Sequence, residues 1–390
     1  MANTLITPGV IAKEALMQLE ENMVMGNLVH RAYKKEFVKI GSTVSIRKPV
    51  KFVASDGATR VNQNVSESTT SIVIDKRKHV SWKFSSEELT LTVKDYSERY
   101  IKPAMIALSN VVDSDLCSLY KKIAAMVGTA GSTPSSFATS VQLVGTSMDD
   151  HAVPRDGRKL VLNPDGYWTM LGGQTGLYQS SSMVEGAYRN ARLGIIGGYE
   201  IFQDQNIKTH TRGTADVGTV AGADQIGSTV NLAAMGISST WKEGDFLTMA
   251  GCYDVNPISG EALDYLKAFV ITADATSAAA ETATVSIYPS IIITGAYKTC
   301  SAAPTNGGVA TVFTANSVNN LAFVKQAFAL VMVPLEMPDG AAFKARESHS
   351  GMSVRVIKSY DVDTDDDIIR LDIMYGVKAI YPELAVRLLG

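Results

Sequence analysis

The fold is decided by residues 43–84, which read TVSIRKPVKFVASDGATRVNQNVSESTTSIVIDKRKHVSWKF. Apolar and polar residues alternate near both ends of this stretch, and Asp56-Gly57 supplies a turn signal between the two alternating runs, which predicts a long two-stranded β ribbon. The ribbon carries few large apolar side chains at its tip, and an isolated ribbon of this kind is only marginally stable in water. We therefore expect its order to come from packing on something else, with a neighbouring subunit as the support.

Basic residues concentrate on this predicted ribbon. They have three interpretations: a solvated ribbon face, a charge-complementary contact with an adjacent subunit, or a phosphate-binding surface. No aromatic residues interleave with the lysines, as a stacking platform for single-stranded nucleic acid would require. We take the following seven residues as candidate inter-subunit contacts: Arg47, Lys48, Lys51, Arg60, Lys76, Arg77 and Lys78.

Helical patterns lie on both sides of the ribbon. Thr7-Pro8 is typical of an N-cap followed by proline at the first helical position, and apolar residues at helical spacing continue this arm to about Leu28. After the ribbon, Asp95-Tyr96-Ser97-Glu98 has the spacing of a capping box and opens an apolar stripe that runs to a C-cap at Gly128. This helix, over 95–128, would be about 45 Å long, and Pro103 either kinks it or marks its true start. A helix of that length beside a ribbon indicates an extended subunit.

The rest of the chain predicts an α+β fold with an inserted all-β domain. From Arg158 an apolar strand, a turn at Asn163-Pro164-Asp165-Gly166 and a short helix follow one another. Between about Thr209 and Asn320 the composition shifts to Ala, Gly, Ser and Thr with several short alternating runs, which predicts a small barrel. The last stretch returns to strands.

Composition bounds the function classes. The net charge of −3 excludes a general polycation, so contact with nucleic acid requires local patches. Residues 1–128 have 18 Lys and Arg against 13 Asp and Glu, whereas residues 209–320 have 4 against 9, so we expect the two regions to face different surroundings. The sequence shows no secretion signal and no membrane segment. Its three cysteines are far apart and fit free buried thiols in a reducing cytosol.

The motifs that resemble catalytic or metal sites are all incomplete. Ser118 and Lys121 match Ser-x-x-Lys, but the partner motifs of that chemistry are missing. The acidic run Asp361–Asp367 resembles a calcium-binding loop of the EF-hand type. Its first, third, fifth and twelfth positions would be Asp361, Asp363, Asp365 and Asp372. However, Asp366 stands where that loop needs glycine, which favours a solvated hairpin turn. Two glycine-rich stretches have neither the Walker lysine nor dinucleotide-binding spacing. We therefore predict no catalytic, cofactor-binding or metal-binding residue.

The order of these parts resembles the Hong-Kong-97-type capsid fold of tailed phages, and more specifically the gene-five-type coat proteins, whose accessory domain is inserted in the apical domain. Three segments carry the resemblance: residues 84–120 with Asp95-Tyr-Ser-Glu-Arg-Tyr-Ile-Lys-Pro, residues 320–331 with Asn-Leu-Ala-Phe-Val-Lys-Gln-Ala-Phe-Ala-Leu-Val, and residues 372–388 with Tyr375-Gly-Val-Lys-Ala-Ile-Tyr-Pro-Glu-Leu-Ala.

The resemblance implies a domain plan for the whole chain. The expected parts are an N-terminal arm over 1–42, an extended loop over 43–83 that lies on a neighbour, a peripheral domain over 84–150 with the spine helix 95–128, a first apical part over 151–208, the inserted domain over 209–310 and closing strands over 311–390.

The resemblance also implies a function without catalysis. The chain would be a major capsid protein in the virion that assembles in the host bacterial cytoplasm into pentamers and hexamers. Its partners would be itself, a scaffolding protein, the portal protein and packaged double-stranded DNA held non-specifically. We expect no covalent crosslink between subunits. We also expect the scaffold to be a separate protein and not a cleaved N-terminal segment of this chain. Two alternatives stay open: the shell of a cellular nanocompartment, and a β module that binds receptors or carbohydrate.

Overall fold

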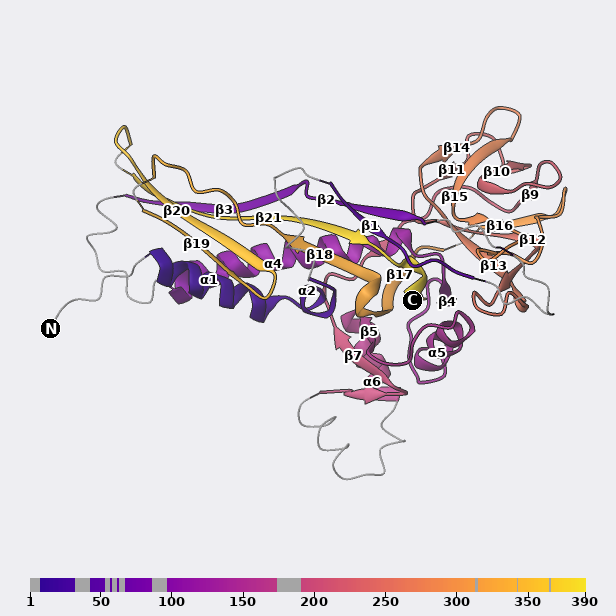
Figure 1. Ribbon diagram of the computed structural model, residues 1–390, viewed down its shortest axis with the longest axis horizontal. Helices are drawn as coiled ribbons and strands as arrows, with labels where there is room; N and C mark the ends of the chain where they lie inside the picture. The colour runs from indigo at the N-terminus through magenta and orange to yellow at the C-terminus, as the bar shows by residue number, and fades with distance from the viewer. Residues whose placement is uncertain are drawn as a thin grey trace, which may run out of the picture. The chain divides into compact units, whose positions relative to one another are not determined.

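The computed structural model describes residues 8–31, 43–52, 57, 62, 67–85, 97–173, 191–312, 315–341, 343–364 and 366–390 (Figure 1). The fold is mixed α+β and divides into two compact units. The first unit contains residues 1–47, 69–116 and 328–380, and the second contains residues 48–68, 117–327 and 381–390. No helix in the described part of the chain is both long and apolar enough to cross a membrane.

The N-terminal helices pack on their own unit. Helix α1 (Pro8–Asn22) lies against strands β19 (Phe343–His349) and β20 (Met352–Asp361), as Figure 1 shows. The predicted apolar stripe is buried in this contact: Ile11, Ala15, Leu19 and Met23 are at most 6% exposed. The short helix α2 (Met25–Leu28) follows. The part of the arm that the structure describes therefore has a core contact within the subunit.

The predicted ribbon is shorter than expected, because its second run divides between two sheets. Strand β1 (Thr43–Arg47) pairs antiparallel with β2 (Thr69–Val73) in a two-stranded sheet. Strand β3 (Lys76–Ser85) instead pairs with β21 (Asp366–Ala379) over ten residue pairs, and Figure 1 shows the two running side by side. Alternation predicts a strand but not its partner, and here the partner lies nearly 300 residues further along the chain.

Strand β21 is the centre of the first unit's 5-stranded sheet. Strand β20 pairs with it, and β19 pairs with β20. Strand β18 (Phe328–Met332) pairs with the end of β21 that β20 leaves free. All five residues of β18 are buried, whereas β20 is buried mainly over its first half. One long strand thus holds together segments from the N-terminal, middle and C-terminal parts of the chain.

The predicted spine helix is also shorter than expected. A π-helical turn, η2 (Ser97–Ile101), leads into α4 (Lys102–Cys117), and a 3-10 segment, η3 (Ser118–Lys122), follows it. Pro103 stands in the first turn of α4, directly after this π-helical turn. Asp95 and Tyr96 of the predicted cap lie outside the described residues.

Gly128 does not cap the helix. It ends strand β4 (Met126–Gly128), which pairs parallel with β22 (Ala385–Leu389). Its φ is +92°, and a Cβ at this position would lie 2.7 Å from the carbonyl oxygen of Leu389. Glycine is required here by the close approach of two strands, a use that its sequence context does not distinguish from a C-cap.

The second unit is built on a 7-stranded sheet in the order β4-β22-β17-β5-β7-β6, with β8 paired to β17. Helices α5 (Val141–Asp150) and α6 (Pro164–Gly173) contribute Val144, Met148, Tyr167 and Met170 to its core. The other strands and 3-10 turns of this part are β5 (Arg158–Leu162), β6 (Ile195–Ile196), β7 (Tyr199–Gln203), β8 (Thr209–His210), β17 (Ser317–Val324), η4 (Lys325–Ala327) and η5 (Pro382–Leu384).

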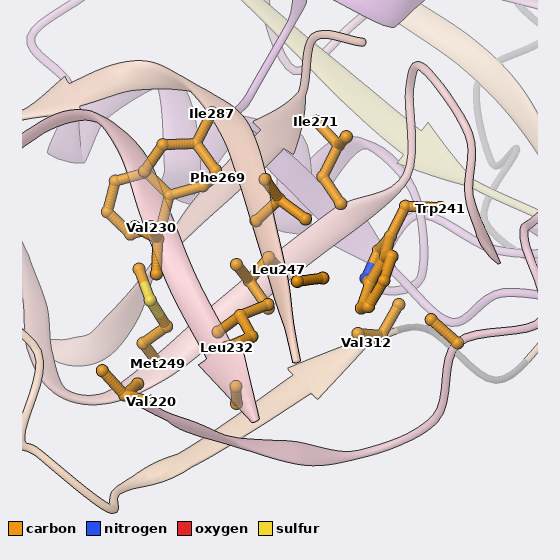
Figure 2. Packing of buried hydrophobic residues seen from close by; sticks show 14 of the residues in the cluster. Val220, Val230, Leu232, Trp241, Leu247, Met249, Phe269, Ile271, Ile287 and Val312 are labelled. Atoms are coloured by element: carbon orange, nitrogen blue, oxygen red, sulfur yellow. The ribbon is translucent and has the colours of Figure 1, made fainter. Parts of the chain in front are cut away.

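The segment predicted to be an all-β insertion forms a closed barrel, in the order β10-β15-β13-β12-β16-β9. Figure 2 shows its core, in which Val230, Leu232, Leu247 and Phe269 pack with Trp241. Closure leaves no free edge between the first and last strands, so the barrel resists edge-to-edge pairing. Its strands, with the small accessory pair β11–β14, are β9 (Gly218–Val220), β10 (Gly227–Ala233), β11 (Thr240–Trp241), β12 (Phe246–Val255), β13 (Ala262–Ile271), β14 (Ala275–Thr276), β15 (Ala283–Ile291) and β16 (Val309–Val312).

Candidate functional site

Three of the seven basic candidates are engaged within their own unit. Lys76 Nζ lies 3.0 Å from Asp115 Oδ2, and Arg77 Nη2 lies 3.7 Å from the buried Asp372 Oδ1. In the second unit, Lys48 Nζ lies 3.5 Å from Glu383 Oε1 and 5.2 Å from the centre of the Tyr381 ring. These contacts stabilise the subunit itself, which sequence alone did not predict.

The remaining four candidates differ from these three. Arg47, Lys51 and Lys78 are exposed, and Arg60 lies outside the described residues. Lys51 contributes its backbone N–H to the hydroxyl of Tyr297, at 3.3 Å, and its side chain has no hydrogen bond or ion pair with any described residue. The same holds for the side chain of Lys78. The exposed amines of Lys51 and Lys78 are thus the residues of this set that can serve a partner.

A buried arginine joins the barrel to the sheet of the second unit. Arg387, on β22, is 0% exposed and donates from Nε and Nη2 to Asn319 Oδ1, and from Nη1 to the carbonyl oxygen of Gly244 at 3.0 Å. Its guanidinium lies 3.9 Å from the ring centre of Phe246 and 4.8 Å from that of Tyr120. Burial lowers its pKa to about 9, since the charge is removed from water. This residue fixes the first residue of β12 against the sheet.

A chain of three polar side chains lies beside Arg387. The hydroxyl of Tyr120 lies 2.9 Å from His210 Nδ1, and His210 Nε2 lies 2.8 Å from Asp245 Oδ1. The other carboxylate oxygen of Asp245 accepts the backbone N–H groups of Lys242, at 2.7 Å, and Gly213, at 3.0 Å. Burial raises the pKa of Tyr120, which keeps its hydroxyl protonated. The chain resembles a catalytic triad in its order, but tyrosine stands in the place of the nucleophile and is not activated.

The hollow beside this chain has a volume of about 220 Å³, and its lining includes the ion-paired Lys121 and Glu243. Lys121 and Lys122 both contact the carboxylate of Glu243, at 3.6 and 2.5 Å. Because Lys121 is held in this ion pair, the Ser118-x-x-Lys121 motif has its lysine directed to Glu243. The geometry favours a structural anchor over a catalytic site.

A second anchor lies at the other end of β12. His151, directly after α5, places Nε2 3.0 Å from Asp254 Oδ2, and Lys267 Nζ lies 2.8 Å from Asp254 Oδ1. Burial would raise the pKa of Asp254, but the hydrogen bond from His151 and the charge of Lys267 outweigh it, so the pKa falls and the carboxylate stays ionised. Asn256 Nδ2 also donates to the carbonyl oxygen of Asp150 at 2.9 Å. Strand β12 is therefore fixed at both ends.

The acidic run around the β20–β21 turn is not arranged as a cation loop in its described residues. Asp366 accepts from Lys83 at 2.8 Å, and Asp372, at the proposed position 12, is buried in ion pairs with arginines. Asp365 lies outside the described residues. Across the described ranges, no three His, Cys, Asp or Glu side chains gather as metal ligands.

Comparison with known proteins identifies one family. The model described as P22 coat protein, gene protein 5, matches residues 2–390. No curated protein gave a significant match.

Several solved structures are similar at low sequence identity. The Mycobacterium phage Che8 structure is 15% identical, with 94% of this chain and 90% of that chain covered and a TM-score of 0.49. The capsid of the cyanophage P-SCSP1u is 10% identical, with 90% of this chain and 84% of that chain covered and a TM-score of 0.45. The capsid of Ralstonia phage GP4 is 11% identical, with coverage of 87% and 80% and a TM-score of 0.45.

Proposed function

This chain belongs to the P22 coat protein family, and from that premise we propose that it builds the shell of a phage head by self-association into pentamers and hexamers. The family model matches nearly every residue, and this single observation carries the proposal. The chain is the major capsid protein of such a head and a component of the virion. The match favours this role over the shell of a cellular nanocompartment.

The finer parts of the proposal come from the resemblance of the sequence to gene-five-type coat proteins. In this view the subunit assembles in the host bacterial cytoplasm with a scaffolding protein, meets a portal protein in the shell and encloses double-stranded DNA. The Hong-Kong-97-type arrangement of arm, extended loop, peripheral domain and apical domain belongs to the same proposal. In a closed symmetric shell, each surface patch that forms an assembly contact must be complementary to a patch on another copy.

The β1–β2 ribbon carries the loop that we assign to a contact with a neighbouring copy. Its ladder continues one step beyond Arg47 and Thr69, because the N–H of Lys48 donates to the carbonyl oxygen of Ser68 at 2.8 Å. Strand β2 also contacts β21, which supports one side of the ribbon within the unit. The connection over 49–67 is the part that we assign to a neighbour.

Replacing residues 49–67 with Asn-Gly should give a soluble, folded subunit that forms no closed shells. The Lys48–Ser68 hydrogen bond makes these two residues suitable flanks of a two-residue hairpin turn, so the strands β1 and β2 keep their register. Negative-stain microscopy measures the shells, and circular dichroism with thermal melting measures the fold. Closed particles of normal size from this variant would contradict the proposed role of the loop.

Tyr297→Phe is the matched control for that deletion. The deletion removes the contact between the Lys51 N–H and the Tyr297 hydroxyl, and Tyr297→Phe removes this contact while the loop stays in place. The control should assemble normally. Loss of assembly in the deletion would then be due to the missing loop and not to the missing Tyr297 contact.

Reversing the charge at Lys51 and Lys78 should weaken assembly without lowering the stability of the subunit. Lys51→Glu with Lys78→Glu should raise the critical concentration for assembly roughly tenfold, since like charges across a contact cost on the order of 1–2 kcal/mol or more. Light scattering against protein concentration, at low and high salt, measures this effect. If the critical concentration does not move at low salt, these amines face solvent in the shell.

Lys76→Glu is the contrasting variant. It sets a carboxylate against Asp115, which also accepts the hydroxyl of Tyr375 at 2.7 Å. This variant should lower the melting temperature of the subunit, because the ion pair lies inside the first unit. The two variants thus distinguish a charge used for assembly from one used for folding.

A further inference from the structure

Two of the three cysteines lie together in the barrel. Cys252 is on β12, and Cys300 is on the connection between β15 and β16. Both side chains are 0% exposed and belong to the same apolar core as Trp241 and Phe269. The third cysteine, Cys117, lies elsewhere in the second unit, with its sulfur 3.9 Å from Asp204 Oδ2.

The backbone brings the two residues onto one face of a short ladder. Asp254 and Cys300 form an antiparallel bridge, and the N–H of Ser301 donates to the carbonyl oxygen of Tyr253 at 3.0 Å. Because side chains alternate along a strand, Cys252 lies on the same side of β12 as Asp254, which is the side that Cys300 shares. The observed burial agrees with this, since Tyr253 between them is exposed.

The two thiols are neighbours and affect each other's pKa. The neighbouring Cys300 thiol and burial raise the pKa of Cys252, whereas the neighbouring Cys252 thiol lowers the pKa of Cys300. The other groups that face the pair are Thr299, whose hydroxyl lies 3.7 Å from the Cys300 sulfur, and the charged Lys267 and Asp254. Cys300 is therefore the thiol that ionises first. Because both thiols are 0% exposed, an oxidant reaches them when the barrel opens locally.

We propose that Cys252 and Cys300 form an oxidisable pair, which remains reduced in a reducing cytoplasm and closes to a disulfide in an oxidising medium. The change of medium rests on the proposed function, because a phage head leaves the cell in which it was assembled. With a diazene oxidant such as diamide, the Cys300 thiolate adds to the N=N bond. The Cys252 sulfur then attacks the Cys300 sulfur, the S–S bond forms, and the oxidant leaves as its hydrazine with both electrons and both protons.

The disulfide would add a covalent link to a connection that hydrogen bonds hold to the barrel. The connection that carries Cys300 is tied by the N–H groups of Thr299 and Cys300 to the carbonyl oxygen of Ile292, and by Thr305 to Ala250. A link from Cys300 to β12 would close a long loop in the unfolded chain and join the connection to the strand that both anchors fix. Oxidation should thus stabilise the barrel.

The test is thiol mapping of the full-length chain before and after treatment with diamide, followed by alkylation under denaturing conditions and peptide mass spectrometry. We expect Cys117 to be alkylated in both samples, and Cys252 and Cys300 to be joined in one crosslinked peptide only after oxidation. The melting temperature of the barrel should rise by about 5–15 °C and return when a reductant is added.

Three variants complete the test. Cys252→Ala and Cys300→Ala should abolish both the crosslink and the rise in melting temperature, whereas Cys117→Ala should keep both. The proposal is overturned if Cys252 and Cys300 remain fully alkylated after diamide treatment, or if they link to Cys117 or between chains. Since the readout does not involve shells, a failure of assembly would leave this result unaffected.

Discussion

Replacing Arg387 with alanine is expected to destabilise the second unit by about 3–5 kcal/mol, the range for removing one member of a buried charged network. The guanidinium holds Asn319 and the carbonyl oxygen of Gly244, and it packs on Phe246 and Tyr120. Alanine would leave buried acceptors without a donor and a cavity where the side chain was. Both effects act at the point where the barrel meets the sheet.

Hydrogen exchange measured by mass spectrometry localises this loss, because it reports the opening of each segment separately. Residues of β12, β17 and β22 should exchange faster in Arg387→Ala. Arg155→Ala is the control, since that side chain is 84% exposed and pairs with Asp149 at the surface. The control should cost less than about 1 kcal/mol. Equal effects from the two variants would mean that Arg387 does not anchor the barrel.

The buried charge of Arg387 also predicts a pH dependence. Its pKa is about 9 in the folded chain, well below its ordinary value, so between these two values the unfolded chain binds the proton more tightly. Stability should therefore rise with pH in that window for the natural chain, relative to Arg387→Ala. A combined variant, Arg387→Met with Asn319→Leu, should recover part of the loss, because it removes donor and acceptor together.

Sequence patterns predict local structure in this chain far better than they predict partners. The helical spacing of Ile11, Ala15, Leu19 and Met23 defines the buried face of α1, and the composition of residues 209–320 predicts the barrel. The pairing of β3 with β21 could not be predicted in this way, because the local sequence of a strand does not show which distant strand it pairs with. The ribbon was therefore predicted too long.

The helix 95–128 was predicted too long for a related reason. Its apolar stripe continues through Ile123 and Met126, but Ile123 is already extended after the 3-10 turn η3, and Met126 begins a strand that pairs with β22. Continuous apolar spacing cannot distinguish a helix that continues from one that yields to a strand. The tertiary pairing decided between them.

One of the two barrel anchors had a recognisable signal in the sequence. Arg387 lies within Ala385–Leu389, an otherwise apolar strand that is buried throughout, and a charge in such a run is usually paired. Asp372 lies likewise between Leu371 and Ile373, although that residue anchors the first unit and not the barrel. The partners His151 and Asp254 are 103 residues apart and gave no signal that sequence alone could join.

Asp372→Asn should destabilise the first unit by about 3–5 kcal/mol, which is the second large effect that we expect. Asp372 is 0% exposed and accepts from Arg355 Nη2 at 2.5 Å and Arg370 Nε at 2.7 Å, with Arg77 at 3.7 Å. Asparagine keeps the volume but removes the negative charge that pairs with Arg355, which is itself just 8% exposed. A melting transition followed by hydrogen exchange in β20 and β21 measures the loss.

The acid dependence of stability tests the same ion pairs in a second way. Burial would raise the pKa of Asp372, but the hydrogen bonds and charges of Arg355 and Arg370 outweigh it and hold the pKa below its ordinary value of 3.8. The carboxylate therefore contributes stability that is fully present above pH 3.8 and is lost as the pH falls through the lowered pKa. The difference in stability between the natural chain and Asp372→Asn should shrink over that interval.

Asp367→Asn, on the same strand, is the control that separates a buried ion pair from a surface one. Its carboxylate lies 2.9 Å from Lys358, and the two side chains are 20% and 32% exposed. Water and salt screen such a pair, so its loss should cost less than about 1 kcal/mol. If Asp372→Asn were no more destabilising than Asp367→Asn, the arginines around Asp372 would have to find other acceptors, and the sheet would not depend on this carboxylate.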